Sequence, residues 1–104
     1  MLENKLYYNK LFDCYSSLFT KSQQEYFISY FHHDLSLSEI SDNMNVSRAG
    51  ISKQLKAIKE ALDIYEEKLG LSKIYDSIDY INENIETLNK DDVKSILSRI
   101  GGEL

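Results

Sequence analysis

The chain has 104 residues, enough for one small domain, and carries a net charge of −5. Its 42 % hydrophobic and 28 % charged residues are typical of a globular protein and exclude a disordered chain. The absence of Pro and the presence of only four Gly predict an all-α fold, because helix interiors disfavour both residues.

Targeting signals and membrane spans are not evident in the sequence. Its first ten residues lack the cationic start and apolar run of a signal peptide, and no apolar run is long enough to span a bilayer. Cys14 is the single cysteine, so it cannot form an internal disulfide. We therefore expect a cytoplasmic protein without membrane insertion.

The charge is distributed unevenly along the chain. Residues 1–35 carry three bases and four acids, residues 36–60 four bases and three acids, and residues 61–104 five bases and ten acids. An acidic total argues against a protein whose whole surface binds nucleic acid, but one short segment is locally basic. Its four bases are Arg48, Lys53, Lys56 and Lys59.

Periodicity predicts a first helix over residues 3–18. Its expected inner side is formed by Leu6, Leu11, Tyr15 and Leu18.

A second helix is predicted to restart after this point and to end near His33. Thr20 with Gln23 has the spacing of a capping box, and Ser22 with Glu25 is an alternative frame. An aromatic face follows, formed by Tyr26, Phe27, Tyr30 and Phe31.

A short third helix and a long fourth helix are predicted next. Ser36 or Ser38 can cap the third helix, and Ser47 can cap the fourth. Asn45, between the two helices, tolerates a left-handed backbone. The fourth helix carries a continuous apolar seam with spacings of 4, 3, 4, 3 and 4, formed by Ile51, Leu55, Ile58, Leu62, Tyr65 and Leu69.

Two further helices are predicted after Gly70, which fits a helix C-cap, with Ser72 and Asn89 as their N-caps. The fifth helix carries the seam Ile74, Ile78, Ile81, Ile85 and Leu88, and the sixth ends before a loose tail of residues 101–104. The two seams favour either an antiparallel hairpin within the chain or a homodimer. The candidate dimer residues are Ile78, Ile81 and Ile85.

The segment from Ile40 to Leu55 has the pattern of a helix-turn-helix. Such a motif needs a small residue where the helices meet, a residue that tolerates positive φ in the turn, and apolar residues on the inner face. Ser41 and Asn45 meet the first two needs. The inner face is completed by Ile40, Met44, Val46, Ile51 and Leu55.

With that inner face, the fourth helix turns a different set of residues outward, namely Ser47, Arg48, Ala49, Ser52, Lys53 and Lys56. These positions would enter the major groove of duplex DNA or reach its phosphate walls. Lys56 and Lys59 suit phosphate contacts. A solvated basic face without a ligand is the alternative interpretation.

No pattern points to an enzyme, a cofactor or a metal site. Cys14, His32 and His33 are poorly placed to share an ion, because adjacent His residues do not readily turn toward one point. The acidic pairs Glu66–Glu67 and Asp91–Asp92 have no accompanying nucleophile or Gly-rich loop, so they are interpreted as solvated.

Residues 18–55 resemble region 4 of bacterial sigma factors, and the sequence is similar to the YlxM family of small helix-turn-helix proteins. The likeness to YlxM covers about residues 6–71. It rests on four stretches: "LFDCYSSLFTKSQQEYF", "DLSLSEIS", "VSR" and "YEEKLGL".

This resemblance implies a sigma region 4-like helix-turn-helix domain over residues 1–69, with an acidic helical extension over residues 70–104. It also implies a DNA-binding regulator linked to the signal recognition particle pathway, with the recognition role carried by Ser47, Arg48, Ser52 and Lys53. The alternative is an interaction module that binds the particle's protein or RNA directly. Family members commonly have bulkier residues after "VSR" than Ala49 and Ser52.

Overall fold

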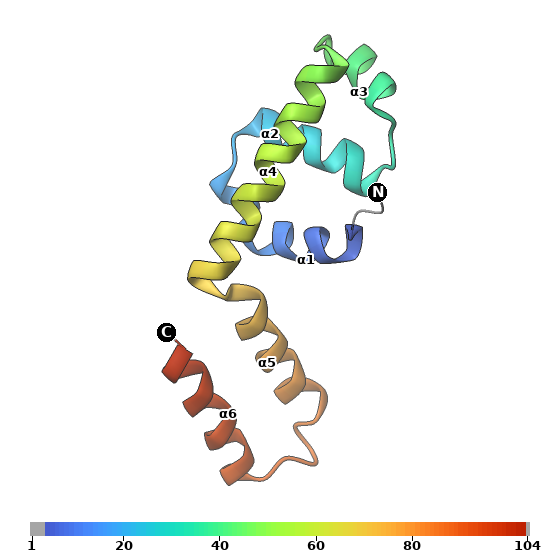
Figure 1. Cartoon of the computed structure of the whole chain (residues 1–104). Coiled ribbons are helices and arrows are strands. Elements are labelled where there is room, and N and C mark those ends of the chain that lie inside the picture. Colours follow the sequence, from blue (N-terminus) through green and yellow to red (C-terminus); the bar gives the residue numbers. More distant parts are fainter. Residues whose placement is uncertain (1–3, 104) are drawn as a thin grey trace. The chain divides into compact units, whose positions relative to one another are not determined.

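A computed structural model describes residues 4–103, and over this range the chain is helical without strands, as the composition predicts (Figure 1). The α-helices are α1 (Lys5–Tyr15), α2 (Lys21–Phe27), α3 (Leu37–Met44), α4 (Arg48–Leu69), α5 (Leu71–Glu83) and α6 (Lys90–Glu103). A 3-10 turn, η1 (Ser16–Leu18), follows α1, and a π-helical segment, η2 (Ile28–His32), follows α2. Within the described range, every helix is too short or too polar to cross a membrane.

The chain divides into two compact units, residues 1–65 and residues 66–104. The boundary lies inside α4, whereas the boundary predicted from the sequence lies at the end of that helix. The first unit therefore contains the predicted helix-turn-helix, and the second contains the last turn of α4 with α5 and α6.

The aromatic residues of α1, α2 and η2 form the centre of the first unit. The rings of Phe12 and Phe27 stack with centroids 4.0 Å apart, and those of Phe27 and Phe31 stack at 4.4 Å. All three side chains are buried. Stacked aromatic pairs add to the free energy gained by removing their area from water, so this column holds the three segments together.

The start of α2 follows one of the two predicted frames. Thr20 Oγ1 accepts a hydrogen bond from the Gln23 backbone N–H at 3.2 Å, and Gln23 Oε1 accepts one from the Thr20 N–H at 3.0 Å. This reciprocal pair confirms the Thr20 capping box and leaves Ser22 inside the first turn.

The predicted inner side of the first helix is wrong at two positions. Leu6 is 85 % exposed and Leu18 is 55 % exposed. The helix instead buries Leu11, Phe12 and Tyr15, and Leu18 lies in η1 after the helix has ended. Glu3, where the helix was predicted to start, lies outside the described residues.

The first four residues of the seam of α4, Ile51, Leu55, Ile58 and Leu62, are buried. Tyr65 follows them, and its ring lies against those of Tyr15 and Phe19. The Tyr8 hydroxyl also donates to Asp63 Oδ2 at 3.1 Å. These contacts fix which side of α4 faces the core of the first unit and which side faces solvent.

In the second unit, α5 is shorter than predicted and ends at Glu83. Asn84 ends it, because its backbone N–H and its side-chain amide both donate to the Tyr80 carbonyl. Ile85 and Leu88 therefore follow the helix instead of extending its seam. Gly70 has the expected positive φ of 63°, but Ser72 is not the N-cap, since its backbone N–H and hydroxyl donate to the Glu66 carboxylate.

The last helix begins as predicted and ends later. Asn89 Oδ1 accepts from the Asp92 N–H at 2.8 Å, and Asp92 Oδ2 accepts from the Asn89 N–H at 3.2 Å. The helix continues to Glu103, so residues 101–103 are helical and the loose tail expected there is absent from the described residues.

The loop between η2 and α3 is held by an ion pair at a left-handed residue. Asp34 has φ 54°, and its Oδ1 accepts from Lys5 Nζ at 2.8 Å. Lys5 also lies 5.0 Å from the centroid of the Tyr30 ring. The hydrogen bond and the charge of Lys5 hold the pKa of the Asp34 carboxyl below its ordinary value of 3.8.

We expect Asp34→Asn to unfold more easily than the wild type at neutral pH. Asn tolerates positive φ, so the substitution removes mainly the charge. A carboxylate with a lowered pKa stabilises the fold above its unfolded-state pKa, and this stabilisation is lost as the pH falls through the folded-state pKa. The difference in urea midpoint between the two proteins should therefore vanish below pH 3.8. An unchanged difference in acid would contradict the assignment.

Candidate nucleic-acid interface

The turn between α3 and α4 has the geometry expected of a helix-turn-helix. Asn45 has φ 55° and ψ 43°, and its backbone N–H donates to the Ser41 carbonyl. The Val46 N–H donates to the same carbonyl at 3.3 Å. The left-handed Asn45 therefore ends α3 and turns the chain toward α4, as predicted from the sequence.

The start of α3 selects Ser36 over Ser38 as the N-cap. Ser36 Oγ accepts from the Glu39 N–H at 3.1 Å, and Glu39 Oε1 accepts from the Ser36 N–H at 3.0 Å. The backbone hydrogen bond and then the side-chain contact with Ser36 lower the pKa of the Glu39 carboxyl. Ser38 has a different contact, because its Oγ lies 3.4 Å from Arg48 Nη1 on α4.

The start of α4 is capped by Ser47, whose Oγ accepts from the Gly50 N–H at 3.0 Å. This contact also explains the glycine. A Cβ at residue 50 would lie 3.0 Å from Ser47 Oγ and 3.1 Å from Val46 Cγ1, closer than ordinary van der Waals contact. The helix thus gives up the roughly 1 kcal/mol by which Ala exceeds Gly in helix propensity, and keeps the cap and turn close together.

The inner face of the motif is formed as predicted. Ile40, Ile51 and Leu55 are buried, which joins α3 and α4 through one apolar contact region. Ser41, Met44 and Val46 are half-buried beside them.

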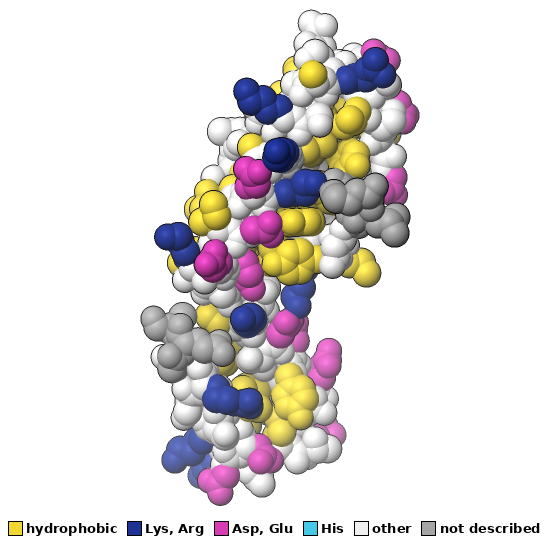
Figure 2. Space-filling view, viewed as in Figure 1, with side chains coloured by type: hydrophobic (Ala, Val, Ile, Leu, Met, Phe, Trp, Pro, Cys, Tyr) yellow, Lys and Arg dark blue, Asp and Glu magenta, His cyan; other side chains and the backbone are white. Residues whose placement is uncertain are grey.

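The predicted outward residues are solvent-exposed, with one exception. Lys59 is half-buried, while the others, Ser47, Arg48, Ala49, Ser52, Lys53 and Lys56, are exposed. Figure 2 shows Lys and Arg side chains along α4, with acidic side chains between them. The exposed side of the first turns of α4 is therefore basic, and its side chains are small apart from Arg48 and the lysines.

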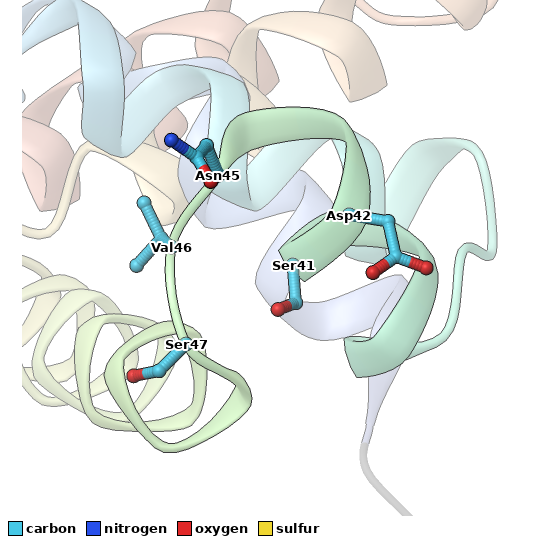
Figure 3. A pocket seen from close by; sticks show the side chains of 5 residues that line it. All are labelled: Ser41, Asp42, Asn45, Val46 and Ser47. Atoms are coloured by element: carbon cyan, nitrogen blue, oxygen red, sulfur yellow. The ribbon is translucent and has the colours of Figure 1, made fainter.

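A shallow hollow of about 390 Å³ lies at the turn, lined by Ser41, Asp42, Asn45, Val46 and Ser47 (Figure 3). The sequence analysis did not single out Asp42, although it stands beside the turn residues. Its negative charge disfavours a phosphate at this point of the motif. An anion that approaches the start of α4 is thus favoured on the side of Arg48 rather than in the hollow.

The remaining candidate residues lie away from this motif. Among the described residues, no three His, Cys, Asp or Glu side chains are grouped so as to hold a metal ion. His32 instead lies edge-on to the rings of Phe12 and Phe27. In the second unit, Ile78 is 42 % exposed, Ile85 is 57 % exposed and Ile81 is half-buried.

Residues 2–99 match the model of one protein family, UPF0122, described as "Putative helix-turn-helix protein, YlxM / p13 like". The UPF0122 protein of a Thermoanaerobacter species is 37 % identical over 94 residues, which cover 86 % of this chain and 80 % of that protein. The UPF0122 protein of Listeria monocytogenes serovar 1/2a is 43 % identical over 75 residues, covering 72 % of this chain and 68 % of that protein.

The geometry of the turn generates a prediction for Asn45. Replacing it by Ala should lower the free energy of unfolding by about 1 kcal/mol, because Ala does not readily adopt positive φ. Asn45→Gly should retain the stability of the wild type within about 0.5 kcal/mol. Urea unfolding of the three proteins compares these values, and equal destabilisation by Ala and Gly would show that the side chain matters more than the backbone.

Proposed function

The chain belongs to the UPF0122 family of YlxM/p13-like helix-turn-helix proteins, and from this membership we propose that it is a regulator that binds duplex DNA through α4. One observation carries the proposal. A left-handed turn and a buried inner face orient α4 so that its exposed side is basic, while the protein as a whole is acidic. A basic patch on an acidic protein favours a polyanion at that patch alone.

The proposal assigns different roles to the outward residues. Ser47, Arg48, Ala49, Ser52 and Lys53 enter the major groove, following the likeness to sigma region 4, and Arg48 is suited to a guanine edge or a phosphate. Ser38 supports this role, because its hydroxyl lies within reach of the Arg48 guanidinium. Lys56 and Lys59 contact phosphates.

The finer proposals concern the process and the assembly. We propose that the regulated process is the signal recognition particle pathway, that the protein acts in the cytoplasm, and that it binds DNA as a homodimer. The link to the particle rests on the family resemblance alone. The homodimer is supported by the exposed isoleucines of the second unit and by the two-fold symmetry of many operators.

A second candidate function is direct binding to the particle's protein subunit or RNA. The charge of residues 66–104 favours the protein over the RNA, because this unit carries five bases and nine acids. In that case the acidic unit makes the contact and α4 has no ligand.

The test for DNA binding is a salt titration with random duplex DNA. If each protomer neutralises about four phosphates, log affinity should fall with log salt at a slope of roughly −3 to −4 per protomer. Arg48→Ala/Lys53→Ala should weaken binding and reduce the slope by about two per protomer. The charge-matched control is Lys10→Ala/Lys21→Ala, which removes two bases of the first unit from outside α4 and should leave the slope unchanged.

The same proteins, titrated with the particle's protein subunit and its RNA, separate the two candidates. Binding to the protein subunit that survives Arg48→Ala/Lys53→Ala, without binding to DNA, would replace the DNA-binding proposal by the second candidate. Equal effects of the two double variants on DNA binding would mean that α4 is not the contact surface.

A further inference from the structure

The second unit leaves most of its apolar side chains uncovered. Between residues 66 and 101, Ile96 is the single apolar side chain that is buried, and it is 8 % exposed. Tyr75, Ile78 and Leu97 are 49 %, 42 % and 53 % exposed. A unit of under ~40 residues rarely forms a sufficient core by itself, so these side chains call for a partner surface.

The positions of these side chains on their helices follow from the contact between α5 and α6. The two helices run antiparallel and side by side (Figure 1), and Ser77 of α5 lines a small cavity with Ile96 of α6. Ser77 and Ile96 therefore mark the sides on which the helices face each other.

Ile78 and Leu97 each come one residue after these inward positions. Each is rotated by about 100° from the inward side of its helix, in the same sense. Because the helices are antiparallel, the two rotations lead to the same face of the hairpin. Tyr75, three residues before Ile78, lies on that face as well. We call Tyr75, Ile78 and Leu97 the apolar face.

Charged residues of opposite sign border the apolar face. On the outer edge of α5, the exposed Asp79 and Glu83 follow Ile78 by one and five residues. On the outer edge of α6, the exposed Lys94 and Lys90 precede Leu97 by three and seven residues. Helical periodicity places each pair next to its apolar neighbour, so one edge is acidic and the other is basic.

We propose that the apolar face binds the same face of a second copy of the chain, and forms an antiparallel four-helix bundle. A two-fold axis that lies in the interface and parallel to the helices sets α5 against α6 of the partner subunit. The acidic edge of each copy then lies opposite the basic edge of the other. An axis perpendicular to the helices would set acidic edge against acidic edge, so the charges select one arrangement.

This arrangement keeps one of the three isoleucines predicted from the sequence at the interface. Ile78 is central, whereas Ile81 lies on the side of α5 that faces α6, and Ile85 follows the end of the helix. The inference rests on the proposed function for its purpose, which is to give two copies of α4 to one assembly, but the interface is tested without DNA.

The apolar contact is tested by Ile78→Gln, with Tyr80→Gln as its matched control. Tyr80 is 53 % exposed and lies two residues further along α5, hence about 200° around the helix on the opposite face. By sedimentation equilibrium, the wild type should have twice the 12.1 kDa mass of one chain. Ile78→Gln should raise the dimer dissociation constant roughly 100-fold or more, because a two-fold interface loses the side chain twice. Tyr80→Gln should remain a dimer.

The charged edges provide a test that does not alter the apolar face. Asp79→Lys/Glu83→Lys makes both edges basic, and Lys90→Glu/Lys94→Glu makes both acidic, so each variant alone should be monomeric. Mixed in equal amounts, the two variants should form a heterodimer, because every edge then meets the opposite charge. Arg48→Ala/Lys53→Ala should stay dimeric even where it loses DNA.

A wild type that remains monomeric at high concentration would overturn the inference and leave the face to a different protein. Dimers of both edge variants alone, or no complex in their mixture, would overturn the proposed arrangement.

Discussion

The burial of one apolar seam along α4 is the constraint on which the first unit depends. Ile51, Leu55, Ile58 and Leu62 must face the aromatic core, and a helix that buries one side has no freedom to rotate about its axis. The basic side chains on the other side are therefore presented by the core and not by their own contacts. Removal of area from water acts over the whole length of this part of the helix, whereas the charged contacts at its surface are few and screened.

Local chemistry made the helix-turn-helix predictable. The caps at Thr20 and Ser36, the left-handed Asn45 and the cap at Ser47 each depend on residues within a few positions, so their spacing in the sequence is sufficient to find them. The inner face follows from the same periodicity. The need for Gly50 was not visible, because it arises from the distance between a missing Cβ and two neighbours that the turn brings close.

The errors occurred where tertiary contacts or competing local contacts decide. Apolar periodicity continues past the end of α5, but Asn84 takes the Tyr80 carbonyl and ends the helix there. Ser72 has the composition of a cap, yet it bonds to Glu66 across the turn. Leu6 fits the stripe of α1 and is exposed, because the core selects the neighbouring stripe. The role of Asp42 beside the turn also depends on folded geometry and not on spacing.

Gly50 and its small neighbours Ala49 and Ser52 bear on how such a protein would act on a chromosome. Few side chains at the start of α4 are long enough to distinguish one base pair from another, so the free energy difference between an operator and bulk DNA is narrow. A bacterial genome offers on the order of 10⁶ competing positions. Occupancy of any one promoter would then follow the number of protein copies per genome, so that abundance, set by synthesis and dilution during growth, becomes the regulatory signal.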